Sequence, residues 1–157
     1  MGLIGPGAFV PGLEESTLIF DAGHWILREA VQAVGRLATT MPAVKSMAIN
    51  VSAKQFRNPC LVSVLRQAIK RWCIDPHRIT LEITEFTESA LIENVDDAQA
   101  VLTQVREMGV RIAIDDFGTG YSSLSYLARF RPDLLKLDKS FVDTIATDEM
   151  TIRSWKA

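Results

Sequence analysis

Four short apolar runs alternate with segments of helical periodicity, and this alternation is the feature that most constrains the fold of the chain. The runs that we expect to be strands are 47–51, 79–84, 111–114 and 134–138. Apolar residues recur at helical spacing over 61–72, 96–108 and 122–130, and further helices are predicted from Asp21 and from Phe141. Strands that alternate with helices predict parallel βαβ units, and hence an α/β fold with about four such units.

The periodicity is compatible with two architectures. Four βα units could form a small doubly wound sheet or half of an eightfold (β/α) barrel. No linker, low-complexity tract or internal repeat divides the 157 residues, so we expect a single domain over 1–157. We expect four aromatic residues in its core, namely Trp25, Phe56, Trp72 and Phe130.

Charge and cysteine content exclude several classes of function. The formal net charge of -2 provides no broad basic field for a nucleic-acid backbone, so no polymeric nucleic acid is expected as a partner. The 2 cysteines have no metal-ligand spacing and favour a reducing compartment, which predicts a cytoplasmic protein. No stretch approaches the ~20 apolar residues of a membrane helix, so no membrane span is expected.

A polar side chain stands at the end of each expected strand. These residues are Asn50, Glu82, the pair Asp115 and Asp116, and Lys136. The carboxyl ends of parallel strands lie on one face of an α/β protein, where active sites are built. Each residue alone has a plainer interpretation as a strand-end or solvated side chain. Together, carboxylates and an amide oxygen form the all-oxygen ligand set that Mg²⁺ or Mn²⁺ prefers.

The adjacent aspartates impose a condition on the backbone. Neighbouring residues of an ideal strand point to opposite faces, so Asp115 and Asp116 reach one site only where the strand ends and the chain turns. Gly118 and Gly120 can supply such a turn. The residues therefore predict a divalent metal site beside a glycine-containing loop.

Four segments resemble the successive signatures of the EAL domain family, and the resemblance covers nearly the whole chain. The segments are 50–56, 81–85, 115–124 and 135–142. The triplet of Asp116, Phe117 and Gly118 also occurs in protein kinases, but neither a Gly-rich nucleotide loop nor a catalytic His-Arg-Asp accompanies it here.

The resemblance implies a TIM-type (β/α) barrel that hydrolyses cyclic di-GMP to the linear dinucleotide with two divalent metals, Mg²⁺ or Mn²⁺. It implies that Asn50, Glu82 and Asp115 are metal ligands and that Asp116 serves the second metal. Lys136 would lie beside the attacking water, and Glu85 would anchor the loop after the third strand. The remaining residues that the resemblance assigns to this loop or to substrate binding are Phe117, Gly118, Thr119, Gly120, Tyr121, Ser122 and Asp138.

Either Glu82 or Glu85 could be the ligand from the second strand. About three residues more than the family pattern separate Glu82 from Asp115, because the Glu-Ile-Thr-Glu of 82–85 is echoed at once in 85–88. We favour Glu82, since the interval back to Asn50 then fits without a gap. An insertion is also tolerated better in the loop after a strand than within the strand.

Two segments of the family pattern have no counterpart in the sequence. The Glu-Ala-Leu strand belongs upstream of Gly2, and the C-terminal βα units belong beyond Ala157. We therefore expect a single partial EAL domain with impaired hydrolysis. The hypotheses are a cyclic-di-GMP phosphodiesterase, a non-catalytic module that binds cyclic di-GMP, and a protein-interaction module. Open strand edges in an incomplete barrel also predict a homodimer.

Overall fold

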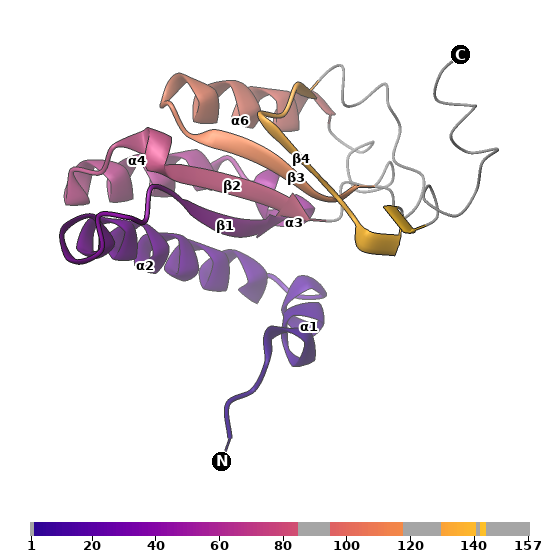
Figure 1. Ribbon diagram of the computed structural model, residues 1–157. Coiled ribbons are helices and arrows are strands. Elements are labelled where there is room, and N and C mark those ends of the chain that lie inside the picture. The colour runs from indigo at the N-terminus through magenta and orange to yellow at the C-terminus, as the bar shows by residue number, and fades with distance from the viewer. Residues whose placement is uncertain (1, 85–94, 118–129, 141, 144–157) are drawn as a thin grey trace.

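Four strands form one parallel sheet in the computed structural model, which describes residues 2–84, 95–117, 130–140 and 142–143 (Figure 1). The strands are β1 (Met47–Ser52), β2 (Ile79–Thr84), β3 (Arg111–Phe117) and β4 (Leu134–Leu137). Their spatial order is β1-β2-β3-β4, and each strand is parallel to the next. A doubly wound sheet reverses its order at a switch point, whereas neighbouring barrel strands follow chain order. The order therefore favours a segment of a barrel, and the predicted parallel α/β fold is confirmed.

Three long helices of the described part of the chain accompany the sheet, and in Figure 1 α2 runs alongside β1. They are α2 (Leu18–Thr40), α4 (Cys60–Trp72) and α6 (Val95–Glu107). Shorter helices that lie wholly within the described residues are η1 (Pro6–Ala8), α1 (Val10–Glu14), α3 (Ala53–Phe56) and η2 (Pro76–Arg78). The helix predicted over 122–130 lies outside the described residues except for Phe130, and so does nearly all of the segment predicted from Phe141. None of the described helices is long and apolar enough to cross a membrane.

The hydrophobic core lies between the helices and one face of the sheet. Alternate strand residues point to the same face, and those on the helix side are almost fully buried: Ile49, Val51, Ile79, Leu81, Ile83, Ile112 and Ile114. They pack in one cluster with buried helix residues that include Leu27, Val31, Leu65, Leu102 and Val105. Burial of each such side chain contributes about 1.5–3 kcal/mol. The core thus fixes which face of every strand is turned away from the helices.

Two of the four aromatic residues predicted for the core belong to it. Phe56 and Phe130 are 1% and 2% exposed, as predicted, but Trp25 is 62% exposed and Trp72 is 40% exposed. The prediction was wrong for the tryptophans because of helical phase. Trp25 stands two positions before the buried Leu27, and two steps of about 100° place it on the far side of α2. Trp72 is the last residue of α4.

Strand register sets the positions of the polar residues on the opposite face. Asn50 of β1 pairs with Glu82 of β2, and Glu82 pairs with Ala113 of β3. Residues in register on parallel strands share a face of the sheet, and Asp115 follows Ala113 by one strand period. Asn50, Glu82 and Asp115 therefore lie towards the carboxyl ends of three neighbouring strands, on the face away from the core.

Candidate active site at the carboxyl ends of the strands

Lys136 joins two carboxylates that come from two other strands. Its Nζ lies 2.6 Å from Oε2 of Glu82 and 3.1 Å from Oδ2 of Asp115. The exposed fraction of the side chains is 10% for Glu82, 23% for Asp115 and 47% for Lys136, so the cluster opens to solvent on the lysine side. Residues of β2, β3 and β4 thus meet at one point, as the strand-end pattern predicted.

The ammonium group keeps its charge at neutral pH. The hydrogen bond that Lys136 donates to Glu82 raises the pKa of the lysine above 10.5, and the hydrogen bond to Asp115 acts in the same direction. Burial opposes these two effects but does not outweigh them. The cluster consequently contains a fixed positive charge between two acidic groups.

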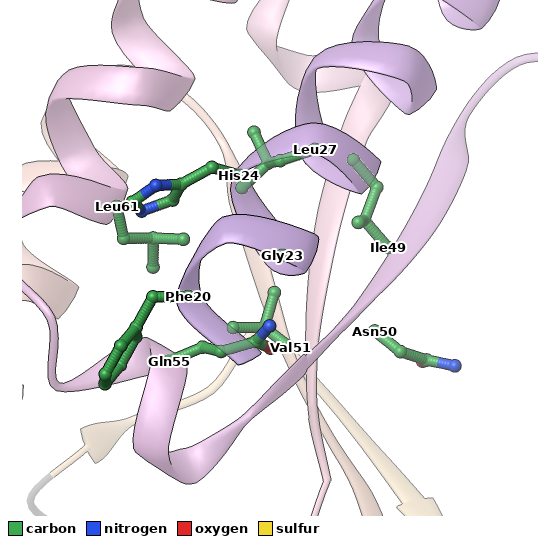
Figure 2. A pocket seen from close by; sticks show the side chains of 9 residues that line it. All are labelled: Phe20, Gly23, His24, Leu27, Ile49, Asn50, Val51, Gln55 and Leu61. Carbon is green, nitrogen blue, oxygen red and sulfur yellow. The ribbon is translucent and has the colours of Figure 1, made fainter. Parts of the chain in front are cut away.

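Asn50 shares the face of this cluster. Its Cα is in register with that of Glu82, and the side chain is exposed. Figure 2 shows the Asn50 side chain on the side of β1 opposite to Gly23 and Leu27 of α2. The amide oxygen of Asn50 is therefore available to a ligand that also contacts Glu82.

The backbone turns at Asp116 itself. This residue has a φ of 53°, in the left-handed region, and the pairing of β3 with β4 shifts between Ile114 and Phe117. The N–H of Asp116 donates to Oδ1 of Asp115 at 3.1 Å. Aspartate tolerates this conformation better than most residues. Asp115 and Asp116 can reach one site only if the strand alternation is broken, and the left-handed Asp116 breaks it. The break lies within β3, earlier in the sequence than Gly118 and Gly120, which were expected to provide it.

Phe117 and Asp138 have local structural roles. Phe117 is 5% exposed and belongs to the core cluster. The carboxylate of Asp138 accepts hydrogen bonds from the backbone N–H of Ser140 at 2.7 Å and from the Ser140 hydroxyl. The other predicted loop and site residues lie outside the described residues: Glu85, Gly118, Thr119, Gly120, Tyr121 and Ser122. Of the two glutamates that the sequence offered, only Glu82 can therefore be placed, and it contacts Lys136.

The turn after β1 contains a motif that the sequence reasoning missed. Ser52 caps α3 through a capping box, in which its Oγ accepts from the N–H of Gln55 at 3.4 Å. In return, Oε1 of Gln55 accepts from the N–H of Ser52 at 2.9 Å. A serine followed three positions later by glutamine is the usual signal for this motif, so the spacing could have predicted it.

A small pocket lies on the helix side of β1, behind Asn50 (Figure 2). Its lining residues are Phe20, Gly23, His24, Leu27, Ile49, Asn50, Val51, Gln55 and Leu61. It offers about 10 Å³, which is roughly the room that one water molecule needs. Its size excludes it as a site for a nucleotide.

The oxygen donors at the strand ends are of the kind that a hard divalent cation prefers. Among the described residues, no group of three or more His, Cys, Asp or Glu side chains could hold a metal. The set consists of the carboxylates of Glu82 and Asp115 with the nearby amide of Asn50. Mg²⁺ commonly uses one or two carboxylates and completes its shell with waters and substrate phosphates. Lys136 already shows that a cationic group fits between the two carboxylates.

Comparison with known proteins gives consistent matches. A family model described as EAL domain matches residues 1–154. MucR of Pseudomonas aeruginosa, a bifunctional diguanylate cyclase/cyclic di-GMP phosphodiesterase, is 41% identical over 147 residues, which are 94% of this chain and 21% of MucR. The chain thus spans about a fifth of the length of this curated relative.

Two solved structures extend the comparison. The complex of the PaMucR phosphodiesterase with c-di-GMP has a TM-score of 0.80 and 40% identity, over 94% of this chain and 58% of that chain. A manganese/cy-diGMP complex of Klebsiella pneumoniae BlrP1 has a TM-score of 0.61 and 33% identity, over 78% of this chain and 31% of that chain.

Proposed function

Because the chain belongs to the EAL domain family, we propose that its strand-end site binds cyclic di-GMP together with Mg²⁺ or Mn²⁺. The predicted fold class, a partial TIM-type barrel of this family, is confirmed by the structural neighbours. The observation that carries the proposal is the convergence of Glu82, Asp115 and Lys136 from three consecutive strands. The PaMucR and BlrP1 structures that resemble this chain are complexes with the same dinucleotide, which supports the choice of ligand.

Each residue has a distinct role in this proposal. Asn50, Glu82 and Asp115 would hold a divalent cation through oxygen atoms, and Asp116 would serve a second one. Such a cation supplies Lewis-acid polarisation of a phosphoryl oxygen and lowers the pKa of a bound water. Lys136 keeps its proton at neutral pH, which suits it to donate to a phosphate oxygen and to balance the charge of Glu82 and Asp115.

We propose that this chain by itself binds the dinucleotide more readily than it hydrolyses it. The described residues bring together two carboxylates and one amide for a first cation, whereas Asp116 alone would be left to serve a second one. Cleavage with two metals requires ligands that clamp both the attacking and the leaving oxygen. Weak turnover and preserved binding are therefore the expected combination.

One set of titrations tests the site assignment. The binding of Mn²⁺ and of cyclic di-GMP would be measured by calorimetry for the wild type and for Asp115→Asn. Asp143→Asn is the matched control, because Asp143 forms an exposed ion pair with Lys139, outside the candidate site. We expect Asp115→Asn to lose about tenfold or more in Mn²⁺ affinity and the control to lose none. Unchanged Mn²⁺ affinity in the folded Asp115→Asn variant would show that the site is assigned wrongly.

A turnover assay with Mn²⁺ and cyclic di-GMP, run beside the binding titration, separates the three functional classes. Hydrolysis at the rate of a complete EAL domain would identify an enzyme and contradict the expected impairment. Binding without turnover would identify a binding module. Neither binding nor turnover would leave a protein-interaction module.

We also propose that two copies of the chain associate through the β4 side of the sheet. Leu134, Leu135 and Leu137 are 48%, 40% and 48% exposed, and β4 lies at one edge of the four-stranded sheet. Exposed aliphatic side chains on an edge strand favour pairing with another chain, and two-fold pairing is the commonest arrangement. Sedimentation at micromolar concentration would show a dimer, whereas a single species of 17.4 kDa at every concentration would exclude it.

A further inference from the structure

The carboxamide of Gln55 links the end of β1 to the start of α2. Its Oε1 accepts from the N–H of Ser52 at 2.9 Å, and its Nε2 donates to the carbonyl of Ile19 at 2.8 Å. Ser52 is the last residue of β1, and Ile19 lies in the first turn of α2. The partners also fix the orientation of the carboxamide, because Ser52 offers a donor and Ile19 offers an acceptor.

Gly23 of α2 provides the space that this side chain occupies. A Cβ at position 23 would lie 2.0 Å from Nε2 and 2.8 Å from Cδ of Gln55. Figure 2 shows both residues at the same pocket. Glycine destabilises the interior of a helix relative to alanine. The close contact of the Gln55 side chain with the helix backbone gives a reason for a glycine at this position. Any larger residue would displace the Gln55 side chain.

Lys54 makes a second link to the same region. Its Nζ donates to the carbonyl of Glu14 at 2.7 Å and to the carbonyl of Ser16 at 3.2 Å. Glu14 ends α1, and Ser16 lies in the turn between α1 and α2. Carbonyls at the end of a helix lack partners within the helix, so Lys54 satisfies groups that would otherwise rely on water. We call Gly23, Lys54 and Gln55 the clamp.

We propose that the clamp positions Asn50 and couples the α1–α2 turn to the strand-end site. Asn50 precedes Ser52 by two residues, and no described residue forms a hydrogen bond with its side chain. Its place is therefore set by the backbone at the end of β1, which Gln55 holds at Ser52. Lys54 and Gln55 both bind backbone carbonyls, so a displacement of residues 14–19 moves the end of β1 as well. This inference rests on the proposed function for the role of Asn50.

Amide hydrogen exchange tests the clamp without any ligand. The variants are Gly23→Ala, Gln55→Ala and the double variant. Gly35→Ala is the matched control on the same helix, because a Cβ there would also lie too close to a side chain, 2.9 Å from Cδ1 of Ile74, but away from the clamp. We expect about five- to tenfold faster exchange at Ser52 and over 17–20 in both single variants. The double variant should exchange no faster than Gln55→Ala alone, and the control should match the wild type.

A conservative variant separates the two halves of the Gln55 link. Gln55→Glu keeps an acceptor for the N–H of Ser52 but loses the donor to Ile19. Exchange at Ser52 should therefore stay near the wild-type rate, while exchange over 17–20 increases. Equal exchange in all variants, or additive effects in the double variant, would overturn the clamp.

Mn²⁺ titration of the same proteins tests whether the clamp positions Asn50. We expect several-fold weaker Mn²⁺ binding in Gly23→Ala and Gln55→Ala, at the low end of the ~10–100-fold loss typical for groups that orient metal ligands. Val105→Ala, a buried residue of α6, controls for lost stability and should leave Mn²⁺ affinity unchanged. If the wild type binds Mn²⁺ and the clamp variants bind it equally well, the positioning role is refuted. If the wild type binds no Mn²⁺ at all, the proposed function fails, and the positioning role fails with it.

Discussion

Replacing Lys136 by methionine should destabilise the fold, because it leaves the Glu82 carboxylate without its cation. The side chain of Glu82 is 10% exposed, and Nζ of Lys136 is 2.6 Å away. Methionine keeps most of the length of the lysine chain and removes the charge. The effect of the substitution therefore reports mainly on the ion pairs rather than on packing.

The expected magnitude follows from the exposure of the partners. Removing one partner of a fully buried ion pair costs about 3–5 kcal/mol, whereas an exposed pair contributes about 0–1 kcal/mol. Lys136 is 47% exposed and Asp115 is 23% exposed, so water screens much of the interaction. We expect Lys136→Met to lower the free energy of unfolding by about 1–2 kcal/mol.

Urea denaturation followed by far-UV circular dichroism measures this loss. With a slope of about 2 kcal/mol per molar urea, the midpoint should fall by about 0.5–1 M. Lys139→Met is the matched control, since the pair of Lys139 with Asp143 is 86% and 60% exposed. A pair of this kind, four residues apart on the surface, contributes less than about 0.5 kcal/mol.

A double-mutant cycle decides whether the assigned contact is responsible. In the background of Glu82→Gln the carboxylate is already neutral, so the further change Lys136→Met should cost less than in the wild type by about 1 kcal/mol. If Lys136→Met costs no more than Lys139→Met, or if its cost is the same in both backgrounds, the electrostatic reasoning is refuted.

Three further outcomes are expected. The stability difference between the wild type and Lys136→Met should be constant from about pH 7 up to the approach to the ordinary lysine pKa of 10.5, because the carboxylates and the lysine are then charged. It should shrink as pH rises through the raised pKa of folded Lys136, which urea titrations between about pH 7 and pH 11 would show. Gly109→Ala should lower the free energy of unfolding by about 1–2 kcal/mol, because Gly109 has a φ of 86° and an added Cβ would lie 3.2 Å from Cε1 of His77. An unchanged melting temperature in thermal unfolding would contradict this. Phe56→Ala should lower the free energy of unfolding by about 3–5 kcal/mol, whereas Trp25→Gln should change it by less than about 1 kcal/mol. Equal losses of the two variants in urea denaturation would contradict the assigned burial.

The strands were predicted closely because they combine uninterrupted apolar runs with polar ends. β2 has the predicted bounds, and β1 extends by one residue to Ser52. β3 continues to Phe117, beyond its predicted end at Ile114, because the left-handed Asp116 lets the pairing with β4 resume. Such an irregularity depends on the neighbouring strand, so hydrophobic periodicity does not indicate it.

The sequence predicted which residues lie in the candidate site, but it did not predict the contacts between them. Parallel strands place their carboxyl ends together, which is why Glu82, Asp115 and Lys136 meet as expected. The sequence did not show that the lysine bridges both carboxylates. Nor did it show that Gly23 makes room for Gln55, because that fit depends on how α2 lies across the turn after β1.

The order of the strands in the sheet also bears on how the chain folds. Each strand pairs with the strand that follows it in the sequence, so every pairing of the described sheet closes a loop of only one βα unit. The separation between paired residues, as from Met47 to Ile79, is that of a single βα crossover, so less loop entropy is lost than if a pairing skipped a unit. Each described strand after β1 can therefore pair with the strand that precedes it in the sequence as the chain leaves the ribosome.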